Sequence, residues 1–160
     1  MKQFTLELNK NIQRPVIKLT DWHQYDVMLD TGALFPVWVD DEATLIAMGS
    51  ECIKDSVEFS GIGGKANGKL YRLPYLKIGD LIYPGLPIIA YQIEIPCQML
   101  LSATMFSHLR YEVDDENHCL NVTVPDSQSC VRNLTIKDEN GHLQVLCTSG
   151  DENLIDTAVK

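Results

Sequence analysis

The sequence has no long hydrophobic run. Hydrophobic residues make up 45% of its 160 residues, but no stretch approaches the roughly 20 consecutive apolar residues that a membrane-spanning helix needs. Residues 1–8 alternate polar and apolar side chains, as a β-strand does, and lack the apolar block of a signal peptide. These absences predict a cytoplasmic protein that does not associate with a membrane.

Runs of basic residues are also missing. The 13 Lys and Arg residues are scattered along the chain, and 22 Asp and Glu residues give a formal net charge of -9. A nucleic-acid-binding surface needs basic side chains gathered along the path of a phosphate backbone. The sequence therefore predicts that nucleic acid is not a partner.

Cysteine pairs, clustered histidines and a nucleophilic serine motif are absent as well. The five cysteines are odd in number and form no C-x-x-C pair, and the four histidines are dispersed. This pattern predicts free thiols, with neither a disulfide framework nor a metal site. No serine lies in a Gly-x-Ser-x-Gly elbow, which argues against the commonest hydrolase mechanism. We expect no metal and no cofactor.

Short strand signals separated by turns are what the sequence does contain. Apolar and β-branched stretches at 15–20, 25–29, 68–78 and 120–124 predict strands. The stretch 81–91 contains Pro84 and Pro87, which favours an edge strand or a bulge. This pattern predicts an all-β fold, either a closed barrel or a sandwich.

One or two short helices are expected beside the strands. Asp40 or Asp41 could cap a helix over 42–48 that ends at Gly49, and 102–110 has the pattern of a second short helix.

The domain organisation is predicted from one linker. Residues 125–129 are polar and begin with a proline, so we expect one domain over 1–124 and a C-terminal extension over 125–160. Within the extension, Asn140-Gly141 separates two apolar stretches and predicts a β-hairpin over 131–147.

The motif Asp30-Thr31-Gly32-Ala33 is the strongest chemical signal. Asp-Thr-Gly alone fits an ordinary turn at the end of a strand. Here, however, the carboxylate follows the apolar stretch 27–29 and precedes the apolar stretch 34–39. An acidic group between two buried segments needs a partner or a function.

A single carboxylate is not enough to hydrolyse a peptide bond. Without a metal or a nucleophilic side chain, one group must deprotonate water and another must donate a proton. Two close carboxylates that share one proton divide these roles. The chain contains one Asp-Thr-Gly, so the second copy must come from the partner of a two-fold homodimer.

The order of these features resembles the retropepsin-like aspartic proteases. A strand, Asp-Thr-Gly-Ala, a short helix, a glycine-tipped hairpin, and an apolar pair before a final helix follow one another from about Pro15 to Val124. The resemblance implies a retropepsin-like homodimer in which Asp30 is catalytic. It also implies that Thr31 hydrogen-bonds across the dimer and that Gly32 and Ala33 form the tight backbone beneath the substrate.

The loop 59–64 resembles the flap that closes over bound peptide in that family. Glycines at 61, 63 and 64 suit such a tip, because they permit positive φ and leave backbone amides free to bind a peptide. We therefore predict that Gly61, Ile62, Gly63 and Gly64 bind substrate. Three apolar residues, Leu34, Ile62 and Ile88, predict apolar substrate side chains around the cleaved bond. In the same family, the terminal strands of the two chains interleave, which makes residues 1–8 and 120–124 the expected dimer interface.

Three positions depart from the family pattern and leave other functions open. Ser102 follows the apolar residues Met99-Leu100-Leu101 and stands where relatives usually carry glycine. Thr104 stands where many relatives carry aspartate, and Leu34 stands where a polar residue is common. The main expectation is an aspartic endopeptidase. The alternatives are a retropepsin-like dimer that binds peptides without cutting them, and a structural β-rich module that is a monomer.

Overall fold

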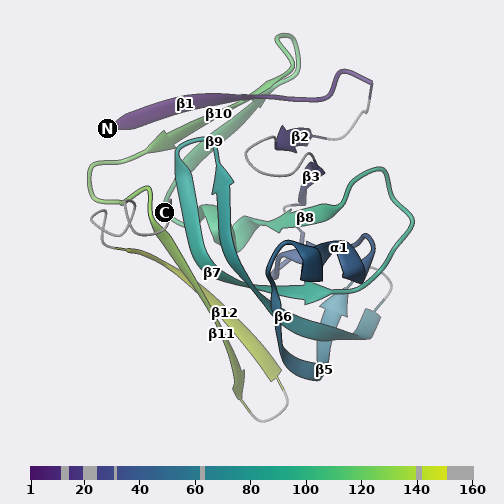
Figure 1. Ribbon diagram of the computed structural model, residues 1–160. Coiled ribbons are helices and arrows are strands. Elements are labelled where there is room, and N and C mark those ends of the chain that lie inside the picture. Colours follow the sequence, from purple (N-terminus) through teal and green to yellow (C-terminus); the bar gives the residue numbers. More distant parts are fainter. Residues whose placement is uncertain (12–14, 20–24, 31, 62–63, 140–141, 151–160) are drawn as a thin grey trace.

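The computed structural model describes residues 1–11, 15–19, 25–30, 32–61, 64–139 and 142–150, and it is mostly β-strand (Figure 1). The strands are β1 (Lys2–Glu7), β2 (Val16–Leu19), β3 (Tyr25–Asp30), β4 (Val37–Trp38), β5 (Glu51–Gly61), β6 (Gly64–Ile78), β7 (Leu81–Ala90), β8 (Met99–Ser102), β9 (Arg110–Asp114), β10 (Cys119–Val124), β11 (Arg132–Glu139) and β12 (His142–Ser149). One α-helix, α1 (Glu42–Ala47), and one 3-10 turn, η1 (Ala103–Phe106), complete the list. No helix within these ranges is long and apolar enough to cross a membrane.

Seven strands form one mixed sheet in the order β2-β3-β8-β4-β7-β6-β5. Strand β3 runs parallel to β8, and the short strand β4 fits between β8 and β7, antiparallel to the first and parallel to the second. The all-β prediction is confirmed. Because the strand order has two ends, β2 and β5, the described residues form an open sheet and no closed barrel.

Alternating side chains divide the apolar residues of this sheet between two faces. The main core lies on one face and includes Val27, Leu29, Trp38, Ile88 and Leu101. The other face carries the pocket-side cluster: Val16, Met28, Phe35, Val37, Val39, Val57, Phe59, Leu70, Ile89, Cys97 and Leu100. Neighbouring residues of one strand point to opposite faces, so β3 and β8 contribute to both clusters.

The helix α1 forms as the sequence predicts. Asp41 is its N-cap and accepts a hydrogen bond from the backbone N–H of Ala43 at 2.9 Å, which satisfies one of the free amides of the first turn. Gly49 follows the helix with φ +88°, a left-handed conformation that favours glycine. The second predicted helix, over 102–110, is wrong in extent, because only the single 3-10 turn η1 forms there.

Strand β7 is internal, which corrects the prediction that its prolines favour an edge or a bulge. It lies between β4 and β6. However, β4 pairs with β7 only at Ile89 and Ala90. Pro84 and Pro87 therefore lie outside that short ladder, where the missing proline N–H removes no hydrogen bond between β4 and β7.

The two terminal strands of the predicted domain pair within the chain. Strand β10 lies between β1 and β9 in a three-stranded antiparallel sheet, with Lys2 opposite Val124 and Glu7 opposite Cys119. Both edges of β10 are therefore occupied, whereas the outer edges of β1 and β9 have no strand partner among the described residues. The predicted interleaving of β10 with a partner would require this pairing to change.

An antiparallel hairpin, β11–β12, lies where the sequence predicts one, and it packs onto the rest of the chain. Val131, just before β11, forms a parallel bridge with Ile82 of β7. Leu134 and Cys147 belong to the main core, while Ile136 and Leu143 pack against the pocket-side cluster. The hairpin is thus attached to both apolar clusters.

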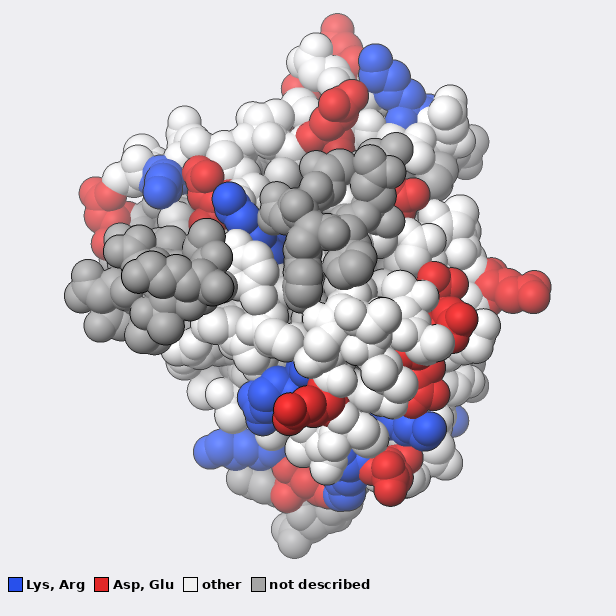
Figure 2. Space-filling view, viewed as in Figure 1, with Lys and Arg blue, Asp and Glu red and all other residues white. Residues whose placement is uncertain are grey.

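Charged side chains are mixed in sign on the surface. Figure 2 shows basic residues in small separate groups, most of them beside acidic ones. Lys65 pairs with Glu58 at 3.5 Å and Lys54 with Asp138 at 2.8 Å. The face in view has no continuous basic stripe in its described part.

Candidate active site

Asp30 is the last residue of β3 and lies opposite Ser102, the last residue of β8. It shares the face of Met28 and Leu100, which places its carboxylate on the side of the pocket-side cluster. Its side chain is partly exposed, unlike the buried residues that precede it in the strand. The sequence thus produces an accessible carboxylate at the end of an otherwise buried strand.

The turn after β3 binds Asp30 by two backbone hydrogen bonds, one to its carboxylate and one to its carbonyl oxygen. The N–H of Gly32 donates to Asp30 Oδ1 at 3.1 Å, and the N–H of Ala33 donates to the Asp30 carbonyl oxygen at 3.1 Å. Thr31 lies outside the described residues, so its predicted role in locking a dimer stays a prediction. The hydrogen bond from the Gly32 amide fixes the orientation of the carboxylate.

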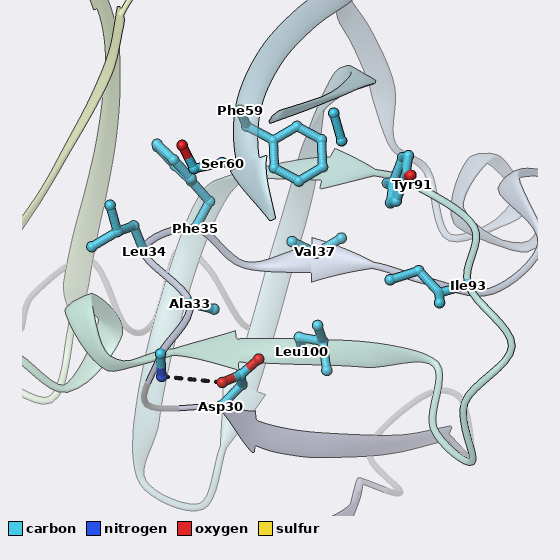
Figure 3. Close-up of a pocket in the computed structure, with 12 residues that line it drawn as sticks. Asp30, Ala33, Leu34, Phe35, Val37, Phe59, Ser60, Tyr91, Ile93 and Leu100 are labelled. Carbon is cyan, nitrogen blue, oxygen red and sulfur yellow. Dashed lines mark hydrogen bonds between the residues drawn. The ribbon is translucent and has the colours of Figure 1, made fainter. Parts of the chain in front are cut away.

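A pocket of about 330 Å³ opens beside this carboxylate (Figure 3). Its lining is mostly apolar and aromatic and consists of Asp30, Gly32, Ala33, Leu34, Phe35, Val37, Phe59, Ser60, Ala66, Tyr91, Ile93 and Leu100. Among these residues Asp30 is the only acidic one. We call this cavity the main pocket. It brings together Asp30, Gly32, Ala33 and Leu34 of the predicted site, and Leu34 is 59% exposed.

The hairpin β5–β6 forms the side of the main pocket that faces Asp30. Gly61 pairs with Gly64, and Phe59 pairs with Ala66. Figure 3 shows Phe59 across the pocket from Asp30. Gly64 has φ +119° with no heavy atom within 4 Å of the position that a Cβ would take, so the strand begins in open space. Ile62 and Gly63, at the predicted flap tip, lie outside the described residues.

An aromatic pair closes one end of the main pocket. The rings of Phe59 and Tyr91 meet edge to face, with centroids 5.4 Å apart and an interplanar angle of 81°. Such pairs contribute about 0.5–1.5 kcal/mol beyond the area they bury. The pair therefore joins the hairpin β5–β6 to the segment that follows β7.

One sequence expectation places a residue on the wrong face. Ile88, predicted to contact substrate, is fully buried in the main core and does not line the main pocket; its neighbour Ile89 belongs to the pocket-side cluster. Trp38, which is close in sequence to the Asp30 loop, is a packing residue that is fully buried in the main core. Its indole N–H donates to the carbonyl oxygen of Asp41 at 2.9 Å.

Several lining residues were missed because they come from segments with no motif. Tyr91 and Ile93 follow the end of β7, and Val37 lies in the two-residue strand β4. Alternation from Asp30 would have found Leu100 if the pairing of β3 with β8 had been known. The sequence alone does not give that pairing.

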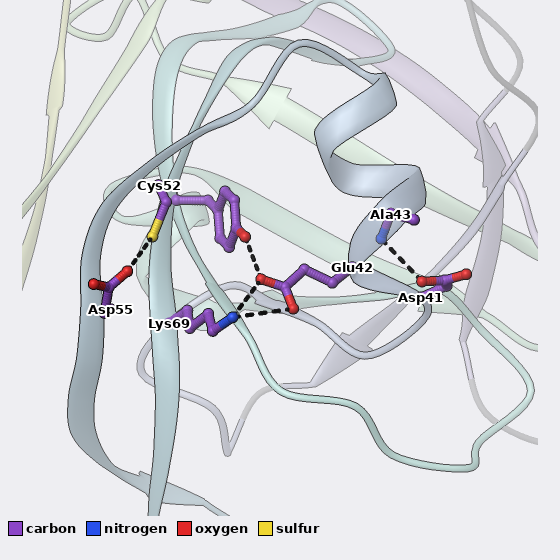
Figure 4. A network of polar contacts seen from close by, with 7 residues as sticks. Asp41, Glu42, Ala43, Cys52, Asp55 and Lys69 are labelled. Carbon is purple, nitrogen blue, oxygen red and sulfur yellow. Dashed lines mark hydrogen bonds and ion pairs between the residues drawn. The ribbon is translucent and has the colours of Figure 1, made fainter.

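A second group of polar side chains lies outside the main pocket and joins α1 to β6 (Figure 4). Glu42 accepts hydrogen bonds from the Tyr71 hydroxyl and from Lys69, whose ammonium lies 3.1 Å from the nearer carboxylate oxygen. These donors lower the pKa of Glu42, and burial together with Glu42 raises the pKa of Tyr71. The described residues contain no group of three or more side chains suited to hold a metal ion.

Comparison with known proteins places the fold. No protein-family model matches the sequence, and no curated protein is similar to it by sequence. The structure is similar to the crystal structure of a retropepsin-like aspartic protease from Rickettsia conorii, with a TM-score of 0.52 and 13% sequence identity over 76% of this chain and 89% of that chain. The chain therefore has the all-β fold of a retropepsin-like aspartic protease.

Proposed function

We propose that this chain is one subunit of a homodimeric aspartic endopeptidase. The observation that carries the proposal is the lone Asp30 carboxylate, held by the amide of Gly32 at the edge of an otherwise apolar pocket. A partly exposed carboxylate at such a place can meet the same residue of a second copy across a two-fold axis. The likeness of the fold to a retropepsin-like aspartic protease supports the same assignment.

The two Asp30 residues would share one proton and act on one water molecule. The ionised carboxylate accepts a proton from the water molecule while the water oxygen attacks the scissile carbonyl carbon. At the same time, the protonated carboxyl donates its proton to the carbonyl oxygen. Collapse of the resulting diol breaks the C–N bond: the proton taken from water passes to the leaving amine, and one diol hydroxyl returns a proton to the carboxylate that had donated one. The products are one carboxylic acid and one amine, and the dyad again holds one proton.

The main pocket favours an extended peptide with apolar side chains. Val37, Leu100 and Ile93 supply apolar walls, and Phe59 and Tyr91 supply aromatic ones. The hairpin β5–β6 would cover the peptide and offer backbone hydrogen bonds, as a neighbouring strand does. Covering the site also excludes bulk water, which strengthens the electrostatic interactions of the dyad.

The dimer is part of this proposal, because one subunit supplies one carboxylate. Free strand edges are available at β1 and β9 of the three-stranded sheet. Either edge could extend that sheet into a partner without disturbing the pairing of β10.

The test is cleavage of a diverse peptide mixture between about pH 4 and pH 7, with cut bonds identified by mass spectrometry. Three proteins are compared: the wild type, Asp30→Asn, and Asp26→Asn as the matched control on the same strand, outside the main pocket. We expect cuts at apolar residues by the wild type and by Asp26→Asn, and none by Asp30→Asn. Cuts that persist in Asp30→Asn would rule out the aspartic mechanism.

A second candidate function is peptide binding without hydrolysis. It is favoured by Ser102, which stands opposite Asp30 in the place of the family's usual glycine and is fully buried. A stable dimer that binds apolar peptides equally well with and without Asp30→Asn, and that cuts none of them, would establish this function instead.

A further inference from the structure

A second, smaller cavity lies directly beside the main pocket. It has a volume of about 120 Å³ and shares Leu34, Phe35, Phe59 and Ser60 with the main pocket. Its remaining lining residues are Glu58, Lys65 and Leu143. We call it the side pocket. Because four residues line both cavities, the two cavities lie side by side.

The feature that distinguishes the side pocket is Leu143, which comes from the hairpin β11–β12. Strand β12 contacts β5, and Lys54 of β5 forms an ion pair at 2.8 Å with Asp138 of β11. Ile136 and Leu143 pack against the pocket-side cluster. Figure 3 shows Leu34 on the side of the main pocket toward these yellow-green strands. The hairpin is therefore placed against the walls of the candidate site.

The chemistry of the side pocket indicates what it can hold. Leu34, Phe35, Phe59 and Leu143 present apolar groups. The charged residues, Glu58 and Lys65, form an exposed ion pair at 3.5 Å and so add no net charge to the opening. The volume is about a third of that of the main pocket. An uncharged aliphatic side chain of modest size fits these properties.

An extended peptide presents every second side chain to the same face. In a strand, side chains at positions i and i+2 point to the same face and lie roughly 6.6 Å apart along the chain. A peptide bound along the hairpin β5–β6 with one side chain in the main pocket would thus present the next side chain on that face to a neighbouring cavity. Phe59 and Ser60, which belong to both pockets, lie on this route.

We propose that the side pocket is a second substrate subsite, contributed by the C-terminal hairpin, which selects a small aliphatic side chain two positions from the residue held in the main pocket. The inference rests on the proposed endopeptidase function and adds a specificity-determining residue, Leu143, from outside the predicted protease domain 1–124. The extension over 125–160 then has a direct part in substrate choice.

The test compares Leu143→Ala, Leu143→Phe and Leu143→Met on a peptide library in which every position around the cut is varied. Leu143→Ala enlarges the side pocket and should shift the preference at one position toward larger side chains. Leu143→Phe fills it and should lower kcat/KM by about tenfold for peptides with a branched aliphatic side chain there. Leu143→Met keeps the side-chain volume nearly unchanged and should therefore retain the wild-type preference.

Two further variants fix the interpretation. Leu146→Ala removes a leucine from the same strand that is 61% exposed and lines neither pocket, so its specificity should equal that of the wild type. Tyr91 lines the main pocket and not the side pocket, so the preference of Tyr91→Ala should change at a position two residues from the one that Leu143 controls. Thermal unfolding of each variant checks that it is folded.

The outcomes separate this inference from the function on which it rests. Cleavage that depends on Asp30 while the Leu143 variants keep the wild-type preference at every position would overturn the subsite and leave the protease standing. The subsite would also be overturned if the Leu143 variants changed the cleavage rate without changing the side-chain preference. The same holds if their effects equalled those of Leu146→Ala. If the wild type cleaves no peptide, the proposed function fails and the subsite fails with it.

Discussion

The two faces of the seven-stranded sheet are built from the same strands, but one face packs into the main core and the other carries the main pocket. On β3, Leu29 faces the main core and Asp30 faces the main pocket; on β8, Leu101 and Leu100 divide in the same way. The first face is closed by other elements of the chain, whereas the second leaves a pocket of about 330 Å³. Adjacent residues of one strand can therefore serve stability and chemistry separately.

The comparison also explains how a carboxylate is tolerated beside so many apolar residues. Asp30 lies at the end of its strand, where its side chain is partly exposed and accepts the Gly32 amide. One position earlier, the same carboxylate would enter the main core, where an unpaired charge costs several kcal/mol. The packed face holds the strand in place, while the open face carries the candidate catalytic carboxylate.

Asp30→Asn should give the largest effect and the clearest separation of the two faces. We expect peptide cleavage to fall by about 10²-fold to 10⁴-fold or more, because the dyad loses its shared proton chemistry. The unfolding free energy should change by no more than about 0.5 kcal/mol, because the amide keeps the shape and still accepts the Gly32 N–H. Steady-state kinetics measures the loss of cleavage, and urea unfolding measures the change in stability. If Asp30→Asn lost activity because it was unfolded, the separation of stability from chemistry between the two faces would be contradicted.

Leu101→Ala and Leu100→Ala form a matched pair on adjacent positions of β8. Leu101 is fully buried in the main core, so its truncation should lower the unfolding free energy by about 2–5 kcal/mol. Leu100 lines the main pocket, and we expect a smaller loss because the new space joins an existing cavity. Peptide KM should rise more for Leu100→Ala. Urea unfolding measures the stability losses, and steady-state kinetics measures KM. Equal stability losses and equal KM values for Leu101→Ala and Leu100→Ala would contradict the distinction between the two faces.

Tyr91→Ala removes one ring of the aromatic pair on the pocket face. Loss of its edge-to-face contact with Phe59 should lower the unfolding free energy by about 0.5–1.5 kcal/mol beyond the effect of the lost buried area. Because the ring also lines the main pocket, we expect peptide KM to rise by up to about tenfold, whereas kcat changes less. Titration of a non-cleaved peptide into Asp30→Asn, with and without Tyr91→Ala, measures the affinity directly. Unchanged affinity would show that the ring does not contact the peptide.

Glu42→Gln should have the smallest effect and should act on stability alone, since Glu42 lies outside the main pocket. Hydrogen bonds from Tyr71 and Lys69 lower the pKa of Glu42 below its ordinary value of 4.5. The stability that these contacts add is therefore present above pH 4.5 and lost as the pH falls through the lowered pKa. We expect Glu42→Gln to be less stable than the wild type by at most about 1 kcal/mol near pH 7.

The pH dependence is the check on this prediction. The stability difference between wild type and Glu42→Gln should shrink as urea unfolding is repeated at lower pH. A difference that stays constant down to the most acidic condition would contradict the assigned contacts, and a change in peptide cleavage near pH 7 would contradict the separation of the two faces.

The sequence predicts the elements well and their pairing poorly. Local signals suffice for Asp41 as a helix cap and for the turn after Asp30, because both depend on hydrogen bonds between near neighbours. The face of Ile88 could not be predicted in the same way. The residues around it, 86–90, are all apolar or proline, so no polar alternation marks which side is which.

Long-range pairing accounts for the other errors. Pro84 and Pro87 argued for an edge strand, since the sequence does not reveal that β4 reaches only Ile89 and Ala90. The side pocket joins Leu34 to Leu143, residues far apart in the chain that no short motif connects. Sequence reasoning found the candidate catalytic carboxylate, whereas the residues that form the pocket around it could be identified only from the fold.

The central claim, one active site made by two chains, is tested most directly by mixing subunits. Wild type and Asp30→Asn are mixed in varying ratios at constant total concentration, allowed to exchange, and assayed for peptide cleavage. If each site needs Asp30 from both subunits, activity falls with the square of the wild-type fraction, to about one quarter in an equal mixture. A linear fall, to about half in the equal mixture, would mean that each chain carries a complete site and would contradict the account.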